Sequence, residues 1–151
     1  MDEGNWYLAE SEIDGLIAFV RFRDNVESLI LSRKYSRYLR VVWEFAADEY
    51  GLPNDEDTQR LEDFENNLCE ALEADDHAVL TFAMTNDGLR QWVFYTQDVQ
   101  ESGRRINKMP QEKERYPIEL TTEEDPNWEE YKKVAANYDD EETEIVDNEE
   151  A

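Results

Sequence analysis

The sequence predicts an α+β fold: a ferredoxin-like βαββαβ core with an added N-terminal β-hairpin and a C-terminal helix. Three observations support this prediction. Several short segments are dense in Val, Trp, Phe and Tyr, as strands are. Residues 55–74 instead carry apolar side chains at helical spacing. Consecutive strand segments are separated by Asp14-Gly15, which is a turn pair, and by Asn86-Asp87-Gly88, which is a strong hairpin signal.

Strands and helices are expected to alternate along most of the chain. The long helix over 55–74 has apolar residues on one face and acidic residues on the other. In the last helix, Asp125 is a suitable N-cap and Pro126 a suitable first residue. The full predicted order is strand 5–10, strand 15–23, strand 38–46, helix 55–74, strands 77–84 and 89–96, helix 98–108, strand 116–121 and a helix from residue 126.

The chain of 151 residues is strongly acidic, with 39 acidic and 15 basic residues and a net charge of -24. Residues 139–150 contain eight acids and no base. We therefore expect one α+β domain over 1–138, followed by a disordered acidic tail over 139–151. Residues 55–76 contain ten acids and a single base, whereas bases gather in 21–40 and 104–115. This distribution predicts a bipolar molecule rather than a uniformly negative one.

The charge and composition disfavour several classes of partner. Each phosphate contact would meet electrostatic repulsion, so DNA is not an expected partner and RNA is a disfavoured one. No apolar run reaches the roughly 18 residues of a membrane span, and the acidic N-terminus does not resemble a secretory signal. The single cysteine, Cys69, cannot form an internal disulfide and is expected to be inert. These features predict a soluble, cytoplasmic protein with a cationic partner.

No catalytic residue, metal site or cofactor is predicted, and the protein is not expected to be an enzyme. His77 is the only histidine, and its sequence neighbours Asp75 and Asp76 do not by themselves form a catalytic triad. The segment that begins at Asp55 starts like a calcium loop but has Arg60 where that loop requires glycine. The common nucleotide-binding, protease and hydrolase motifs are also absent from the sequence.

The candidate partner-binding residues come from the acidic helix and from the aromatic segments. Core packing is the default role for the tryptophans. However, two helices cover only one face of a ferredoxin-like sheet, and an aromatic sheet face is typical of RNA-binding modules. The candidates are Glu62, Glu65, Glu73, Asp75, Asp76, Arg90, Trp92 and Trp128.

Four stretches of the chain resemble a known family. They are Trp6-Tyr7 with Gly15, Leu61-Glu62-Asp63-Phe64, Thr85 to Tyr95, and Tyr116-Pro117-Ile118 followed by Glu124 to Tyr131. Over roughly residues 5–135, the chain resembles a bacterial family of domains of unknown function, DUF695. The resemblance implies no established activity. It implies a distant association with regulators of ribonuclease E activity, which are small acidic ferredoxin-like proteins that inhibit by binding, although a shared fold does not transfer a function.

Two functions follow from these observations. The first is a non-enzymatic acidic protein-binding module that inhibits or regulates a cationic partner. A nuclease is the natural example of such a partner, because its nucleic-acid groove is basic. The alternative is an RNA- or small-ligand-binding module that uses an aromatic sheet face together with the basic segments. Adaptation to high salt is a further explanation of the acidity.

Overall fold

The computed structural model describes residues 6–13, 15–109, 117–137 and 144–146. Within these ranges, the strands pair antiparallel in one sheet of order β6-β3-β5-β4-β2-β1-β7, with helices packed against it. The predicted α+β class is therefore confirmed. The elements in chain order are β1 (Trp6–Ile13), β2 (Leu16–Arg23), α1 (Glu27–Ser32), β3 (Arg37–Glu44), α2 (Asp55–Glu73), the 3-10 turn η1 (Ala74–Asp76), β4 (Ala78–Asn86), β5 (Leu89–Thr96), α3 (Val99–Lys108), β6 (Ile118–Glu124), α4 (Glu129–Asn137) and β7 (Glu144–Val146).

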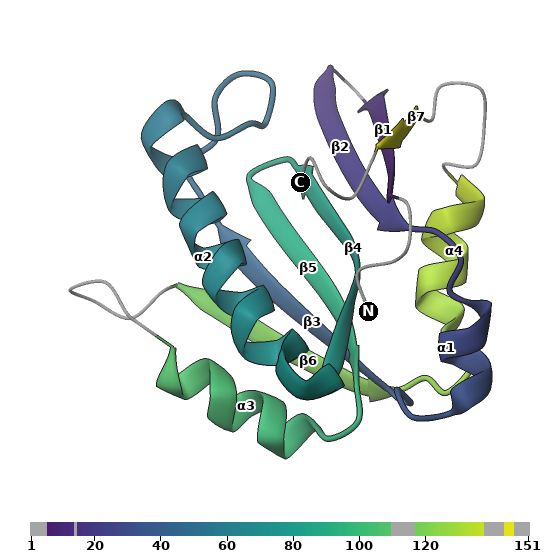
Figure 1. Cartoon of the computed structure of the whole chain (residues 1–151). Helices are drawn as coiled ribbons and strands as arrows, with labels where there is room; N and C mark the ends of the chain where they lie inside the picture. Colours follow the sequence, from purple (N-terminus) through teal and green to yellow (C-terminus); the bar gives the residue numbers. More distant parts are fainter. Residues whose placement is uncertain (1–5, 14, 110–116, 138–143, 147–151) are drawn as a thin grey trace.

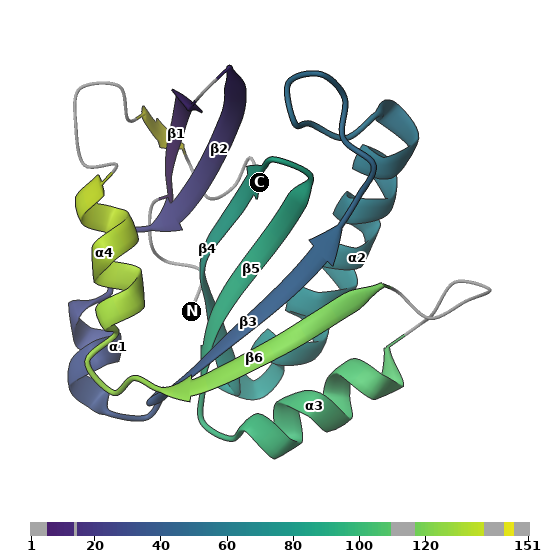
Figure 2. The same cartoon turned by 180° about the vertical axis from the view of Figure 1, so that it is seen from behind.

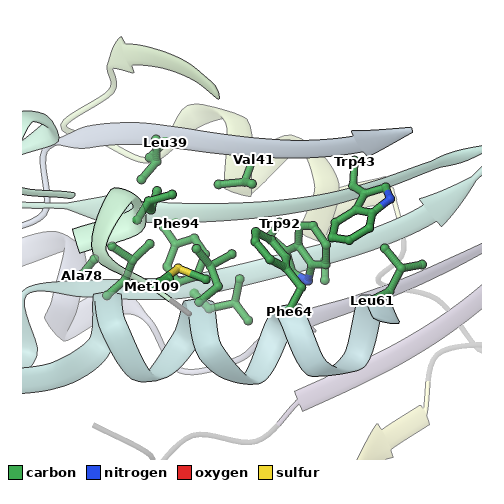
Figure 3. Packing of buried hydrophobic residues seen from close by; sticks show 14 of the residues in the cluster. Leu39, Val41, Trp43, Leu61, Phe64, Ala78, Trp92, Phe94 and Met109 are labelled. Atoms are coloured by element: carbon green, nitrogen blue, oxygen red, sulfur yellow. The ribbon is translucent and has the colours of Figure 1, made fainter. Parts of the chain in front are cut away.

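The helices α2 and α3 lie on one face of the sheet, as Figure 1 shows. The apolar face of α2 that the spacing predicts points into this core, as Leu61 and Phe64 show in Figure 3. Leu68 of the same face is also fully buried. The Phe64 ring lies between two strand tryptophans, with centroid distances of 5.3 Å to Trp43 and 5.1 Å to Trp92. This aromatic contact fixes the rotation of α2 about its axis, and so decides which of its acids point outward.

On the opposite face, α1 and α4 pack over the part of the sheet that holds a second buried cluster, which includes Val20, Val79 and Tyr95. No described helix lies over β6 and much of β3 in the view of Figure 2. The sequence analysis did not predict α1, which has only six residues and lies between two positive-φ residues, Asn25 and Arg33. Its Leu29 and Ile30 pack against the buried cluster of this face. A helix this short has little stability of its own, and tertiary packing rather than local propensity holds it in place.

The N-terminal hairpin extends the sheet, because β2 pairs with β4 through contacts such as Phe22 with Phe82. At the far edge, residues 144–146 form β7 and pair with Trp6, Tyr7 and Leu8 of β1. These three residues of the predicted disordered tail thus form a strand in the structure, and the other predicted tail residues lie outside the described ranges. Pairing with a neighbouring strand supplies hydrogen bonds that no periodicity in the tail reveals.

Two predicted boundaries near the C-terminus differ from the structure. The strand expected over 116–121 is β6, and it runs on to Glu124 because it pairs along β3 as far as Arg37. The last helix begins at Glu129 rather than at Pro126. Trp128 takes a left-handed conformation, φ 59°, which interrupts any helix before it. The burial of its indole outweighs this backbone cost of order 1–2 kcal/mol.

Candidate functional site

Five acidic residues of α2 form one exposed face, here called the outer acidic face: Asp55, Glu56, Glu62, Asp63 and Glu70. At 3.6 residues per turn these five positions span an arc of roughly 120°, opposite the apolar residues that face the sheet. The helix starts at Asn54, whose side chain accepts a hydrogen bond from the Asp57 backbone N–H at 2.7 Å. Acids in this first turn also interact favourably with the helix dipole.

The charges of the outer acidic face are not neutralised by neighbouring bases. Within the described ranges, no ion pair joins any of its five carboxylates to an arginine or lysine. The base of the same helix, Arg60, instead pairs with Asp57 at 3.5 Å and lies over the Trp43 ring, 5.1 Å from its centroid. The face therefore presents negative charge to the solvent on a rigid element.

Glu65 lies on the side of α2 that faces the sheet, and its carboxylate joins three groups there. It accepts hydrogen bonds from Arg21 at 3.0 Å, from Arg90 at 2.7 Å and from the Trp92 indole N–H at 2.7 Å. Burial opposes the charge of the carboxylate, but the two guanidinium groups outweigh it and lower the pKa of Glu65 from 4.5 to about 2. Glu65 is therefore a structural anion that holds α2 against β2 and β5.

Two further predicted acids are also paired within the protein. Glu73 pairs with Arg23 at 3.4 Å and accepts the Leu80 backbone N–H at 3.1 Å. Asp75 pairs with Arg105 at 2.9 Å. Arg105 also donates hydrogen bonds to the backbone carbonyls of residues 71 and 74, which lie at the C-terminal end of α2, where carbonyls lack partners within the helix. Both acids therefore stabilise the junctions around α2.

Asp76 is exposed at the turn that follows α2. Its backbone carbonyl, rather than its carboxylate, makes the contacts of this residue: it accepts hydrogen bonds from the Tyr35 hydroxyl and the Gln97 amide, both at 2.8 Å. Asp76 and Glu62 are thus the predicted acids that remain free to meet a partner. Of these two, only Glu62 belongs to the outer acidic face.

The predicted tryptophans are not surface residues, because Trp92 and Trp128 are both 0% exposed. Trp128 stacks on Tyr95 at 4.5 Å, and its indole N–H donates to the Tyr35 carbonyl at 2.8 Å. Because Trp92 is buried in the core beneath α2 and Trp128 in the cluster of the opposite face, neither ring is available in this conformation to stack on a base or to contact a partner. Both tryptophans therefore pack in the interior, where the sequence had offered them as partner-binding residues.

A buried polar network explains the Asp-Pro-x-Trp-x-x-Tyr stretch quoted for the family resemblance. The Asp125 carboxylate accepts the Tyr95 hydroxyl at 2.7 Å and caps α4 by accepting two of its backbone N–H groups at 2.9 and 3.1 Å. The Tyr131 hydroxyl donates to the Arg23 carbonyl of β2. These contacts fasten α4 to the sheet, so the stretch encodes packing of the second face rather than a binding site.

His77 lies in the interior beside Ser102 and Thr96. Its Nε2 lies 2.8 Å from the Ser102 hydroxyl and 3.2 Å from the Thr96 hydroxyl. A serine–histidine pair suggests nucleophilic chemistry, but Ser102 is fully buried and, in the described part of the chain, no carboxylate hydrogen bonds to the other ring nitrogen. Burial lowers the pKa of His77, which keeps the ring neutral. The network ties the start of α3 to β4 and β5.

The described residues line a groove and a smaller hollow at the surface. A groove of about 450 Å³ runs between α2 and α3, lined by residues that include Ala71, Arg104 and Lys108. A smaller hollow of about 110 Å³ lies over β2, β4 and β5, where Arg21 and Arg90 reach the surface. Within the described ranges, no group of three His, Cys, Asp or Glu side chains is arranged to hold a metal ion. No helix of this part of the chain is long and apolar enough to cross a membrane.

Sequence reasoning missed the inward-facing arginines of β2, Arg21 and Arg23. The signal that would have found them is the strand alternation itself, which places both on the same face as Phe19 and opposite the buried Val20 and Phe22. The Trp6 ring lies beside both guanidinium groups, at 5.0 and 4.6 Å from its centroid. Charged residues on a face that packs against α2 need carboxylate partners, which are the partly buried Glu65 and Glu73.

Comparisons with known proteins place these features in a family. Neither the search of curated proteins nor the search of solved structures gave a match. A family model described as "Family of unknown function (DUF695)" matches residues 4–134, which span the outer acidic face, the Glu65 cluster and the Asp125 network. The chain therefore belongs to the DUF695 family.

Proposed function

We propose that this domain is a non-enzymatic protein-binding module that docks a basic partner on the outer acidic face of α2 and thereby inhibits or regulates it. The observation that carries the proposal is the set of five exposed carboxylates on one arc of a rigid helix, none paired with a base of the described chain. A solvated helix needs no such one-sided concentration of a single charge. A nuclease is a fitting partner class, because its nucleic-acid groove is basic.

The physical basis of the proposal is electrostatic steering. A face of one charge raises the association rate with an oppositely charged protein by orders of magnitude, and salt reduces the effect. Because α2 is held in place by the Phe64 contacts and by Glu65, its charges are already positioned before a partner arrives. Less ordering entropy is then lost on binding than for charges on a loop.

The proposal includes a fold relationship and a location. The segment β3-α2-β4-β5-α3-β6, with its strands in the order β6-β3-β5-β4, is proposed to be a ferredoxin-like core to which β1 and β2 add a hairpin. Regulators of ribonuclease E activity are small acidic proteins of that class, which favours inhibition by binding. A cytoplasmic location is part of the same proposal, since the partner must be reached there.

The experiment is a capture from cell lysate with the immobilised full chain, washed at low salt and eluted at high salt. The test variant neutralises the outer acidic face with Asp55→Asn, Glu56→Gln, Glu62→Gln, Asp63→Asn and Glu70→Gln. The control variant makes the same change in charge at exposed acids elsewhere, with Glu10→Gln, Glu27→Gln, Glu44→Gln, Glu49→Gln and Glu129→Gln.

The expected result is a basic protein that the natural chain and the control capture and the outer-face variant does not. Both variants should keep the circular dichroism of the natural chain, since none of the ten side chains is buried. Equal capture by the two variants would show that charge in general, and not this face, attracts the partner. Absence of any salt-eluted basic protein from the natural chain refutes the proposal altogether.

A further inference from the structure

The strand β6 is one edge of the sheet, and in the described structure it pairs with β3 alone (Figure 2). Seven consecutive residues pair with β3 without a register shift, from Ile118 opposite Trp43 to Glu124 opposite Arg37. Every side chain from Glu119 to Glu124 is exposed. The free side of β6 is therefore a long, regular edge.

An edge strand carries backbone N–H and C=O groups without strand partners, which makes it a template for another strand. Proteins commonly protect such edges with proline, lysine, a bulge or a very short strand. β6 has none of these features: its sequence is Ile-Glu-Leu-Thr-Thr-Glu-Glu. Its protection comes from carboxylates alone.

These carboxylates reject some strands and attract others. Glu124 pairs with Arg37 at 3.4 Å, whereas no described base pairs with Glu119 or Glu123. If two copies of β6 paired antiparallel about Thr121, Glu119 of each copy would lie opposite Glu123 of the other. Like charges directly opposite each other destabilise a strand pair, and two chains of net charge -24 also repel at long range. A second copy is therefore the wrong occupant.

The side chains of β6 define the occupant that fits. Glu119, Thr121 and Glu123 alternate along one face of the strand, and the two free carboxylates are four residues apart. Leu120, on the other face, is 44% exposed. A matching strand thus has basic residues four positions apart on one face and a β-branched or other apolar residue against Leu120.

We propose that β6 accepts an added β-strand from a basic protein, recognised by Lys or Arg at positions i and i+4 of an extended segment. Strand addition rests on the proposed function, because both require a basic partner. It adds the mode of binding, in which backbone hydrogen bonds supply affinity and the spacing of the bases supplies selectivity. The outer acidic face then steers the partner, and the edge of the sheet holds it.

The test uses a synthetic peptide with capped ends, Val-Lys-Val-Thr-Val-Lys-Val, titrated into the ¹⁵N-labelled full chain at low salt. The control peptide, Val-Lys-Val-Thr-Lys-Val-Val, has the same composition and charge but places its two lysines on opposite faces of a strand. Protein variants complete the design: Glu119→Gln with Glu123→Gln on β6, and, as the matched control, Glu10→Gln with Glu27→Gln at exposed acids outside both proposed binding surfaces.

The expected result has three parts. Amide resonances of residues 118–124 shift, and their hydrogen exchange slows when the first peptide is added. The control peptide binds about three- to tenfold more weakly, as does the first peptide to the β6 variant, because each loses facing charge pairs. The variant with Glu10→Gln and Glu27→Gln binds the first peptide as the natural chain does.

Two outcomes overturn the proposal. One is equal affinity for both peptides, which means that charge alone attracts them. The other is the absence of shifts in 118–124 at millimolar peptide, or shifts confined to α2. Shifts confined to α2 leave the outer acidic face as the docking surface, so the proposed function survives without strand addition. If the first peptide adds to β6 but the outer-face variant still captures its partner from lysate, strand addition stands and the outer acidic face is not the docking surface.

Discussion

Replacing Glu65 with Gln removes the carboxylate that joins Arg21, Arg90 and Trp92 across the boundary between α2 and the sheet. The pKa of Glu65 is lowered from 4.5 to about 2 in the folded chain. At about 1.4 kcal/mol for each tenfold change in proton affinity, this difference corresponds to about 3 kcal/mol of stability at pH 7. Because Gln still accepts a hydrogen bond, we expect the variant to be less stable by about 2–3 kcal/mol.

The pH dependence separates this explanation from a packing defect. A folded-state pKa below the unfolded value means that the stabilisation is complete above about pH 4.5 and is lost as the pH falls toward 2. The measurement is urea unfolding of the natural chain and of Glu65→Gln, followed by tryptophan fluorescence at several pH values from 7 to 2. The difference between the two free energies of unfolding should shrink toward zero over that range.

The matched control is Glu62→Gln, on the same helix and exposed, which should stay within about 0.5 kcal/mol of the natural chain at pH 7. A loss below about 0.5 kcal/mol for Glu65→Gln would show that the carboxylate does not hold α2 in place. A larger loss that stays constant down to pH 2 would show that shape, and not charge, is what the substitution removes. Either result refutes the reasoning.

Four further predictions concern the interior. Burial lowers the pKa of His77 from 6.5, so stability is complete above about pH 6.5 and falls as the pH drops below it. His77→Gln should lose that slope in urea midpoints measured from pH 7.5 to 5.5, and a slope that persists contradicts the assignment. Asp125→Ala should lower the free energy of unfolding by about 2 kcal/mol, because α4 loses its cap and Tyr95 loses its hydrogen-bond acceptor. A loss below about 0.5 kcal/mol in urea unfolding would contradict this role. Leu68→Ala should lower the free energy of unfolding by about 2–5 kcal/mol in the same assay. A loss below about 1 kcal/mol would show that this site is less tightly packed than its complete burial indicates. Burial raises the pKa of the Cys69 thiol, so a disulfide reagent should leave the folded chain unmodified during the time in which the urea-unfolded chain reacts fully.

Local patterns in the sequence were enough to predict the elements that have a strong period. The apolar spacing of Leu61, Phe64, Leu68 and Leu72 predicts α2 and the direction of its buried face, and the structure has both. The strand 89–96 and the turn before it are also as predicted. Helical geometry relates positions within a few turns of each other, so a single stretch of sequence is enough to place acids and apolar residues on opposite faces.

The packing of elements that are distant in the chain determines which charges and aromatic rings are available at the surface. Glu62 and Glu65 are three positions apart on one helix, yet Glu62 is exposed and Glu65 is held by Arg21, 44 residues away in the chain. Trp128 is buried because α4 folds back across the sheet, where Tyr131 bonds to a residue 108 positions away. Local periodicity assigns a residue to a face of its own element. It contains no information on which distant element packs there, and that packing settles whether a carboxylate stabilises the fold or meets a partner.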